Sequence, residues 1–225
     1  MAADKSNALA NIQEQLRNEL ANLSNRVAPP SGNNISLKGG VFNLPDGTTN
    51  KGPLECIILD WRVINAFYTG PYDPQNPKPP KCWAISEEID AAAPTDAVEE
   101  KQSESCSGCP MNEFGSAPTG KGKACKNQRR LAVVPVDATA ETQPMTITVS
   151  PSGLSKYENY VTRLGGPEYE AMPIQMVTRI GFDPNVTYPS LVFAPGDRVP
   201  EDRLGTLLNL RQAAQSLLDR GFEPK

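Results

Sequence analysis

The segment Leu54–Tyr68 reads LECIILDWRVINAFY, and the architecture expected for the whole chain follows from it. It is rich in β-branched and aromatic residues, which favour a strand, and it is long enough to curve. Shorter strand signals lie on both sides of it and are bounded by turn residues. These signals are Ile35–Phe42, Arg130–Val136, Met145–Val149, Pro173–Phe182 and Tyr188–Phe193.

One helix interrupts this series of strands. In residues 152–164 apolar side chains recur at helical spacing, and Gly165-Gly166 ends the pattern. With Arg130–Val136 and Met145–Val149 counted as one strand, the order is three strands, one helix and two strands, which is that of an OB-fold. The sequence therefore predicts a mainly β fold, an OB-fold-like Greek-key barrel over residues 35–195, with the helix plugging one end. A large insertion, residues 70–129, separates the second strand from the third.

Helices are expected on both sides of this domain. Residues 1–28 contain apolar side chains at spacings of three and four, namely Leu9, Ile12, Leu16, Leu20, Leu23 and Val27. Such a helix packs on its own domain or pairs with a second copy of the chain, which would make a homo-oligomer. Residues 200–221 predict the C-terminal helix, which begins at Pro200 and ends at Gly221.

Composition excludes several classes of function. The chain has no histidine, so Ser-His-Asp and Cys-His catalysis within one chain are ruled out. Its net charge is −4, and contact with nucleic acid would need a local basic patch. No apolar run reaches the roughly 18 residues of a membrane span, and the N-terminus has no apolar signal core. We expect a cytoplasmic protein, where thiols stay reduced and clustered cysteines favour metal binding.

Four cysteines predict a zinc site. Cys82, Cys106, Cys109 and Cys125 are separated by 23, 2 and 15 residues. A Cys-x-x-Cys turn brings two thiolates to one metal ion, and two further cysteines complete a closed, structural tetrahedron for one Zn²⁺. Two disulfides, a thioredoxin-like redox motif and an iron–sulfur cluster are the alternatives. Cys56 lies in an apolar run and is expected to be a buried core thiol.

A basic loop follows the Cys-x-x-Cys turn. Five positive charges, with no acid among them, fall within ten residues: Lys121, Lys123, Lys126, Arg129 and Arg130. These side chains are candidates for contacts with DNA phosphates, and the alternative is an ordinary solvated loop. The preceding stretch, Gly115–Gly122, nearly matches a phosphate-binding loop, but Gly122 stands where a magnesium-binding Ser or Thr is required. A nucleotide site is therefore not expected.

Aromatic residues cluster near this module. In a strand, Arg62 and Tyr68 would share the face opposite to that of Trp61 and Phe67, so one face is expected to be core and the other available. Exposed aromatic rings beside basic side chains bind single-stranded DNA by stacking on its bases. The predicted DNA-binding residues are Arg62, Tyr68, Tyr72, Trp83, Lys121, Lys123, Lys126, Arg129 and Arg130.

Three runs carry a resemblance to a known family. NAFYTGPYDPQNPKPPKCW (65–83), CSGCPMNEFGSAPTGKGKACKNQRRL (106–131) and VTRIGFDPNVTYPSLVF (177–193) resemble single-stranded DNA-binding proteins of tailed phages, over roughly residues 35–195. The plan is also similar to that of phage helix-destabilising proteins, which place a zinc subdomain within an OB-fold. The resemblance implies a phage-encoded protein of the bacterial cytoplasm, with phage replication proteins as partners.

The C-terminus departs from that pattern. Helix-destabilising proteins commonly end in an acidic tail that recruits partners, whereas this chain ends in GFEPK. The acidic segment 87–104 could replace such a tail.

The sequence thus predicts a non-catalytic protein that binds single-stranded DNA in phage DNA replication or recombination. The main alternative is a structural or regulatory zinc protein that binds another protein, which the net acidity and the N-terminal helix favour. A nuclease is a third hypothesis, but the acids available (Asp60, Asp73, Asp90 and Asp96) form no paired-carboxylate motif.

Overall fold

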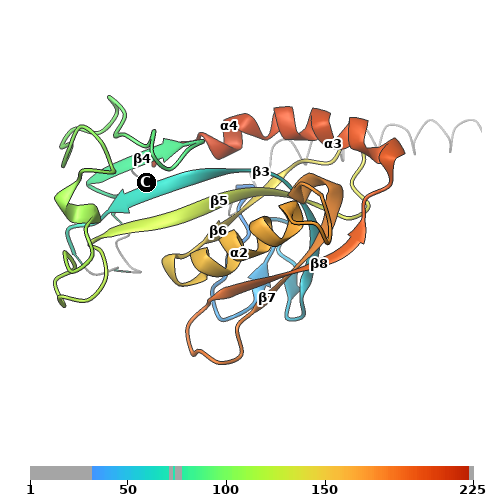
Figure 1. Cartoon of the computed structure of the whole chain (residues 1–225), viewed down its shortest axis with the longest axis horizontal. Coiled ribbons are helices and arrows are strands. Elements are labelled where there is room, and N and C mark those ends of the chain that lie inside the picture. The colour runs from blue at the N-terminus through green and yellow to red at the C-terminus, as the bar shows by residue number, and fades with distance from the viewer. Residues whose placement is uncertain (1–31, 71–72, 74–77, 223–225) are drawn as a thin grey trace, which may run out of the picture.

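A single antiparallel sheet organises the chain, as seen in a computed structural model that describes residues 32–70, 73 and 78–222 (Figure 1). Its central strand is β3 (Leu54–Phe67), which pairs with β4 (Cys82–Ser86), β5 (Cys125–Pro135) and β7 (Met176–Phe182). β6 (Met145–Val149) pairs with β5, and β8 (Leu191–Arg198) pairs with β7. The order along the sheet is β6-β5-β3-β7-β8, with β4 beside the outer half of β3.

The remaining elements cover or extend this sheet. The helices are α2 (Leu154–Gly165), α3 (Glu201–Ala213) and α4 (Gln215–Leu218). Short 3-10 turns occupy Pro110–Asn112, Pro151–Gly153 and Pro173–Gln175, and a small hairpin consists of β1 (Phe42–Asn43) and β2 (Thr49–Asn50). Within the described residues, no helix has both the length and the apolar character needed to cross a bilayer.

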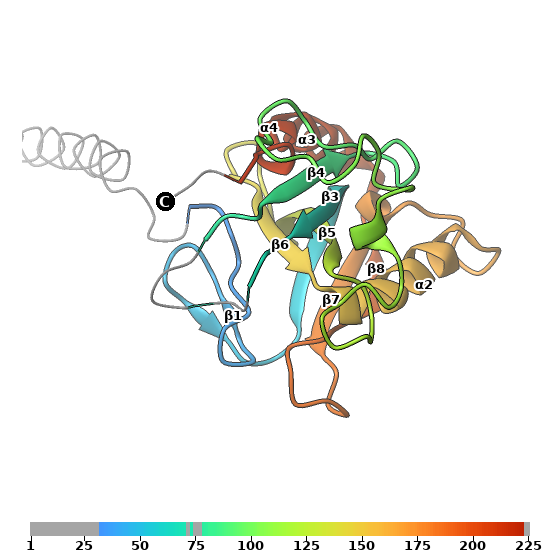
Figure 2. The same ribbon diagram turned by 90° about the vertical axis from the view of Figure 1, so that its left-hand side faces the viewer.

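Both faces of the sheet are buried. Cys56, Ile58 and Leu131 pack on one face in a core that includes Tyr157 and Leu164 of α2. The alternating positions in the same two strands, among them Ile57, Leu59 and Val134, pack with Leu207 and Leu218 of the C-terminal helices. Figures 1 and 2 show α3 and α4 on one side of the sheet and α2 on the other.

This arrangement contradicts the predicted mainly β, OB-fold-like Greek-key barrel. Among the described strands, β6 and β8 end the sheet without pairing to each other, so the sheet is open and the fold is mixed α/β. The physical reason lies in the runs Cys56–Leu59 and Leu131–Val134, in which consecutive residues are buried. A strand buried on both faces needs a layer on each side, which the helices supply. Accordingly α2 lies against β8 on one face and does not plug a barrel end.

Other expected elements fare differently. The strand expected at Arg130–Val136 begins earlier, at Cys125, and β4 was not predicted at all. The segment Ile35–Phe42 forms one isolated bridge, from Ser36 to Asn43, and the start of the small hairpin in place of a full strand. The C-terminal helix is interrupted at Ala214, between α3 and α4. The N-terminal helix expected in residues 1–28, with its role in oligomerisation, lies outside the described residues.

A β-bulge in β3 positions the residues of the candidate site. The register with β5 shifts between Ile58 and Asp60, so Leu59 is an extra residue on the β3 side. Beyond the bulge the parity is inverted: Trp61 packs on the α2 side, whereas Arg62 faces the C-terminal helices. The outer half of the strand thus presents different chemistry to the two layers.

Candidate metal and nucleic-acid site

Two of the four cysteines are brought together by the sheet. Phe67, at the end of β3, pairs with Cys82 of β4 on one side and with Cys125 of β5 on the other. Directly opposed residues of an antiparallel pair project to the same face. Cys82 and Cys125 therefore lie on one face of the sheet, at the same level.

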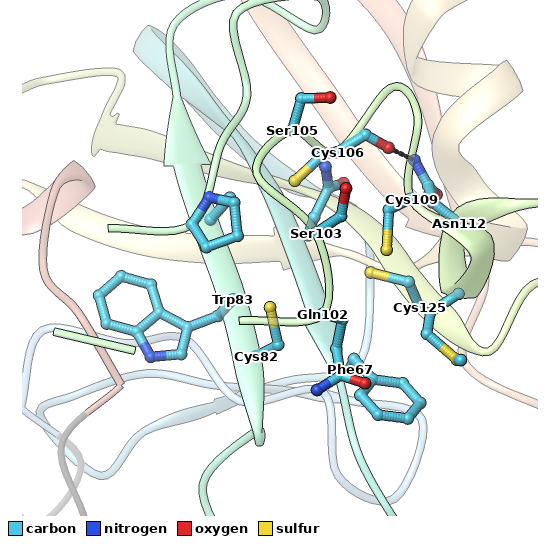
Figure 3. Close-up of a pocket in the computed structure, with 14 residues that line it drawn as sticks. Phe67, Cys82, Trp83, Gln102, Ser103, Ser105, Cys106, Cys109, Asn112 and Cys125 are labelled. Atoms are coloured by element: carbon cyan, nitrogen blue, oxygen red, sulfur yellow. Dashed lines mark hydrogen bonds between the residues drawn. The ribbon is translucent and has the colours of Figure 1, made fainter. Parts of the chain in front are cut away.

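The loop between β4 and β5 supplies the other two. The Cys106 amide donates to the Ala92 carbonyl oxygen at 2.9 Å, and the Asn112 amide donates to that of Cys109 at 2.8 Å. The Asn112 side chain also donates to the Cys106 carbonyl oxygen at 2.8 Å. All four cysteines are buried and line one cavity, where Figure 3 shows their sulfur atoms around a common space.

The cysteines influence one another electrostatically. Burial and the neighbouring Cys106, Cys109 and Cys82 raise the pKa of the Cys125 thiol to about 12. Burial also raises the pKa of Cys106, against the effect of a hydrogen bond with the Asn65 side chain. All described cysteines are free thiols, so the two-disulfide alternative is not what the structure shows.

The donor set fits a thiophilic cation, although the geometry is not that of a closed site. As the side chains stand, no three Cys, Asp or Glu side chains among the described residues are grouped closely enough to hold one ion. Four buried thiols without a competing carboxylate nevertheless match the ligands that Zn²⁺ takes in structural sites. If an ion binds, Cys82, Cys106, Cys109 and Cys125 would hold it as thiolates. Cys56 stands apart in the apolar core, where burial raises its pKa to about 12.

An asparagine cluster joins the cysteine loop to the strands. Asn127 on β5 donates to the side-chain oxygens of Asn65 on β3, at 2.7 Å, and of Asn112, at 2.9 Å. The Asn112 oxygen also accepts a hydrogen bond from the Lys123 ammonium at 3.3 Å. Asn112 therefore connects the backbone of two cysteines with the basic loop, a connection that the sequence did not indicate.

The glycine-rich stretch forms a tight double turn. Gly120 and Gly122 adopt φ of +69° and +79°, the left-handed region that favours glycine. The Gly115 amide donates to the Gly122 carbonyl oxygen at 2.7 Å, which closes the loop. The stretch then leads into strand β5, whereas a phosphate-binding loop leads into a helix.

A basic and aromatic surface surrounds this turn. Lys121 and Lys126 line a hollow with Tyr68, whose side chain is 39% exposed. A neighbouring hollow is lined by Lys121, Lys123, Lys126 and Phe114, and Phe114 is 84% exposed. Within the described residues none of these three lysines has an ion-pair partner. We call Tyr68, Phe114, Lys121, Lys123 and Lys126 the end surface.

Phe114 was missed at the sequence level. It is a lone aromatic residue between polar and glycine residues, and it belongs to no periodic pattern. Its only signal was its position inside the cysteine loop, where an apolar side chain has little core to enter.

Two other expected DNA contacts are nearly buried in ion pairs. Arg62 is 4% exposed and pairs with Asp219 at 2.7 Å and with Glu87 at 3.0 Å. Arg129 is 5% exposed and pairs with Glu158 at 2.8 Å.

Two more of the predicted DNA-binding residues, Arg130 and Trp83, contact the C-terminal segment. Arg130 donates to the Leu218 carbonyl oxygen at 2.9 Å, and Trp83 packs against Phe222 with ring centroids 5.6 Å apart. Tyr72 lies outside the described residues. The structure therefore groups Tyr68 with the three lysines but not with Arg62, Trp83, Arg129 or Arg130.

Relatives give no further guide to the site. No family model matches the sequence, and neither the curated proteins nor the solved structures contain a significant match to it.

Proposed function

We propose that this chain binds single-stranded DNA, without catalysis, through the end surface. The observation that carries the proposal is the grouping, around adjoining hollows, of two exposed aromatic rings and three lysines that have no acidic partner among the described residues. Following the sequence resemblance, the setting would be phage DNA replication or recombination in the bacterial cytoplasm.

The chemistry of the end surface matches that of an unpaired strand. Lysine ammonium groups attract phosphates and release their counterions, which gives affinity without sequence preference. Exposed aromatic rings such as Phe114 stack on bases, and a base can stack in this way only when it is not already paired. The net charge of −4 would keep the interaction confined to this surface.

A structural Zn²⁺ at the cysteine cavity would support the same surface. Lys121 and Lys123 lie between Cys109 and Cys125, and Lys126 follows directly, so an ion joining these thiolates to Cys82 and Cys106 would restrain this segment from both ends. Few apolar side chains are available there, since the local cluster contains only Ala84, Ala92 and Cys106. A metal ion would replace the missing apolar core.

Fluorescence anisotropy with labelled oligonucleotides tests the proposal. Single strands should bind much more tightly than duplex, and their affinity should fall as salt is added. The double variant Lys121→Ala/Lys123→Ala should flatten the plot of log K against log salt by about 1.4, because each phosphate contact on a single strand contributes roughly 0.7.

The matched control is Lys38→Ala/Lys51→Ala, which removes the same amount of charge. Lys38 precedes and Lys51 follows the small β1–β2 hairpin. This control should leave the salt dependence unchanged. Equal binding of duplex and single strands, or no binding of single strands near 50 mM salt (about the low end of such comparisons), would reject the proposal.

The alternative, a zinc protein that binds another protein, rests on the acidic segment 87–104. Most of its acidic side chains are exposed, and three of them are paired: Glu87 with Arg62, Asp96 with Lys101 and Glu100 with Lys81. A surface of this kind fits a basic protein partner. Failure of DNA binding with retention of a folded, metal-containing protein would favour this function.

A further inference from the structure

A second hollow lies along α2, beyond the end surface. It opens between the α2-facing side of β3 and β5 and the helix, and its volume is about 280 Å³. Trp61, Val63, Arg129 and Tyr157 are among the residues that line it, and Ile89, 60% exposed, stands at its rim. This size is just below the range of roughly 300–1,000 Å³ of sites for drug-sized ligands, so the hollow suits a smaller ligand. We call it the Trp61 pocket.

A buried hydroxyl group borders the pocket. Tyr157 is 1% exposed, and its hydroxyl makes no hydrogen bond within the described part of the chain. The Tyr157 ring meets that of Trp61 edge-on, with centroids 5.9 Å apart. A buried hydroxyl without a partner destabilises a folded protein, and a ligand in the hollow that hydrogen-bonds to it would remove that cost.

The charges of the pocket are balanced. Arg129 is neutralised by Glu158 at 2.8 Å, and Glu87 is neutralised by Arg62 at 3.0 Å. Hydrogen-bond donors and acceptors are therefore present beside an aromatic ring, without the excess positive charge that a phosphate needs. Such a lining suits an uncharged, planar, polar ring, and carboxylate and guanidinium groups both pair with base edges.

The Trp61 pocket continues the hollow of the end surface. The hollow beside Lys121 and Lys123 is lined by Asn127 of β5 and Leu154 of α2. The Trp61 pocket is lined by Arg129, the next residue of β5 on the same face, and by α2 from Tyr157 onward. At 1.5 Å per helical residue, Leu154 and Val161 are about 10 Å apart. The hollow beside the lysines and the Trp61 pocket thus follow one another along β5 and α2.

We propose that the Trp61 pocket receives one unpaired nucleobase of the bound strand, with the ring against Trp61 and a polar edge on the Tyr157 hydroxyl and Arg129. This inference rests on the proposed function and adds a base-binding position to the phosphate contacts of the end surface. Tyr157 and Arg129 would act as binding residues, and the lysines would hold the neighbouring phosphates.

The test uses the full chain and Trp83→Phe, which leaves Trp61 as the only tryptophan of the two. An oligonucleotide should quench Trp61 fluorescence, whereas a strand of equal length and charge with abasic sites should quench it far less. Tyr157→Phe should weaken binding of the base-bearing strand about threefold to tenfold, the range of one net hydrogen bond. It should leave the abasic strand unaffected.

Thermal unfolding separates this effect from damage to the fold. Tyr157→Phe removes a hydroxyl that has no hydrogen-bond partner among the described residues, so its Tm should not fall. Unchanged Trp61 fluorescence on a strand that binds, or equal binding by Tyr157→Phe, would overturn the inference and leave the proposed function standing. Loss of all strand binding in the parent protein would overturn both. In Lys121→Ala/Lys123→Ala both strands should bind more weakly, which separates phosphate contacts from the base contact.

Discussion

Replacing Arg62 by alanine should destabilise the protein without changing the salt dependence of the proposed DNA binding. The side chain is 5% exposed and joins β3 to the C-terminal helices through Asp219 at 2.7 Å, with a further hydrogen bond to Gln215. Glu87, at 3.0 Å, ties the same guanidinium to the segment after β4. Arg62 therefore connects three parts of the chain.

The size of the expected destabilisation depends on how far each carboxylate partner of Arg62 stays buried once the guanidinium is removed. Removing one member of a buried ion pair typically destabilises a protein by about 3–5 kcal/mol, because the other charge stays buried. Asp219 and Glu87 are 53% and 77% exposed, so both recover water. Asp60, 15% exposed, keeps Arg211 at 3.1 Å. We therefore expect a loss of about 2–3 kcal/mol, and a fall in Tm of roughly 4–12 °C for a chain of this size.

Differential scanning calorimetry and the salt dependence of DNA binding measure the two effects separately. The control is Arg179→Ala, which breaks an ion pair with Glu55 at 2.7 Å whose two side chains are about half exposed. Water screens that pair, so Tm should hardly change. An unchanged Tm in Arg62→Ala, or a decrease of about 0.7 in its salt slope, would refute the structural role and restore Arg62 as a phosphate contact.

Three further outcomes are expected. Metal analysis of freshly reduced protein should find about one Zn²⁺ per chain, which Cys125→Ser should lose and Cys56→Ala should keep; a metal-free parent protein would remove zinc from the proposal. Burial raises the pKa of Cys56 to about 12, so above its ordinary value of 9.0 the unfolded thiol ionises first and the free energy of unfolding falls with pH. In Cys56→Ala that fall should be shallower by about 1.4 kcal/mol per pH unit, and identical slopes in urea titrations would contradict the burial. A Cβ at Gly221 would lie 2.9 Å from the Trp83 ring, so Gly221→Val should lower Tm and change Trp83 fluorescence; an unaltered spectrum would show that this contact is absent.

Local patterns predicted the elements better than their assembly. The β-branched run of β3, the helical spacing of α2 and the Pro200 start of α3 are local signals, and the structure contains each element near its expected bounds. The prediction of a barrel was wrong because the order of strands alone does not determine whether a sheet closes. The sequence signal for a sheet covered on both faces is the run of consecutive apolar residues Cys56–Leu59, all of which are buried in the structure.

The assignment of Arg62 depended on a partner that local reasoning cannot find. Alternation correctly placed Arg62 and Trp61 on opposite faces of β3. That reasoning assumed that the Arg62 face is open, whereas Asp219, 157 residues away, covers it. That Cys106 and Cys109 lie close together could be predicted from the sequence, because Cys-x-x-Cys is a short-range signal. The positions of Cys82 and Cys125 depend on strand pairing, since both residues pair with Phe67 of β3.

The length of β3 and β5 explains why a cysteine cluster and a basic surface occur together. Near Ile58 the two strands are covered by helices on both faces and need no further support. Near Phe67, the outer end of both strands, the buried apolar cluster consists of three small residues, Ala84, Ala92 and Cys106. Hydrophobic burial therefore contributes little to stability there. A metal ion bound by Cys82 and Cys125, on the two strands that flank β3, would stabilise this end without adding apolar surface. Polar and charged side chains can then occupy the loop beside it, which is the requirement for a surface that binds phosphates and bases.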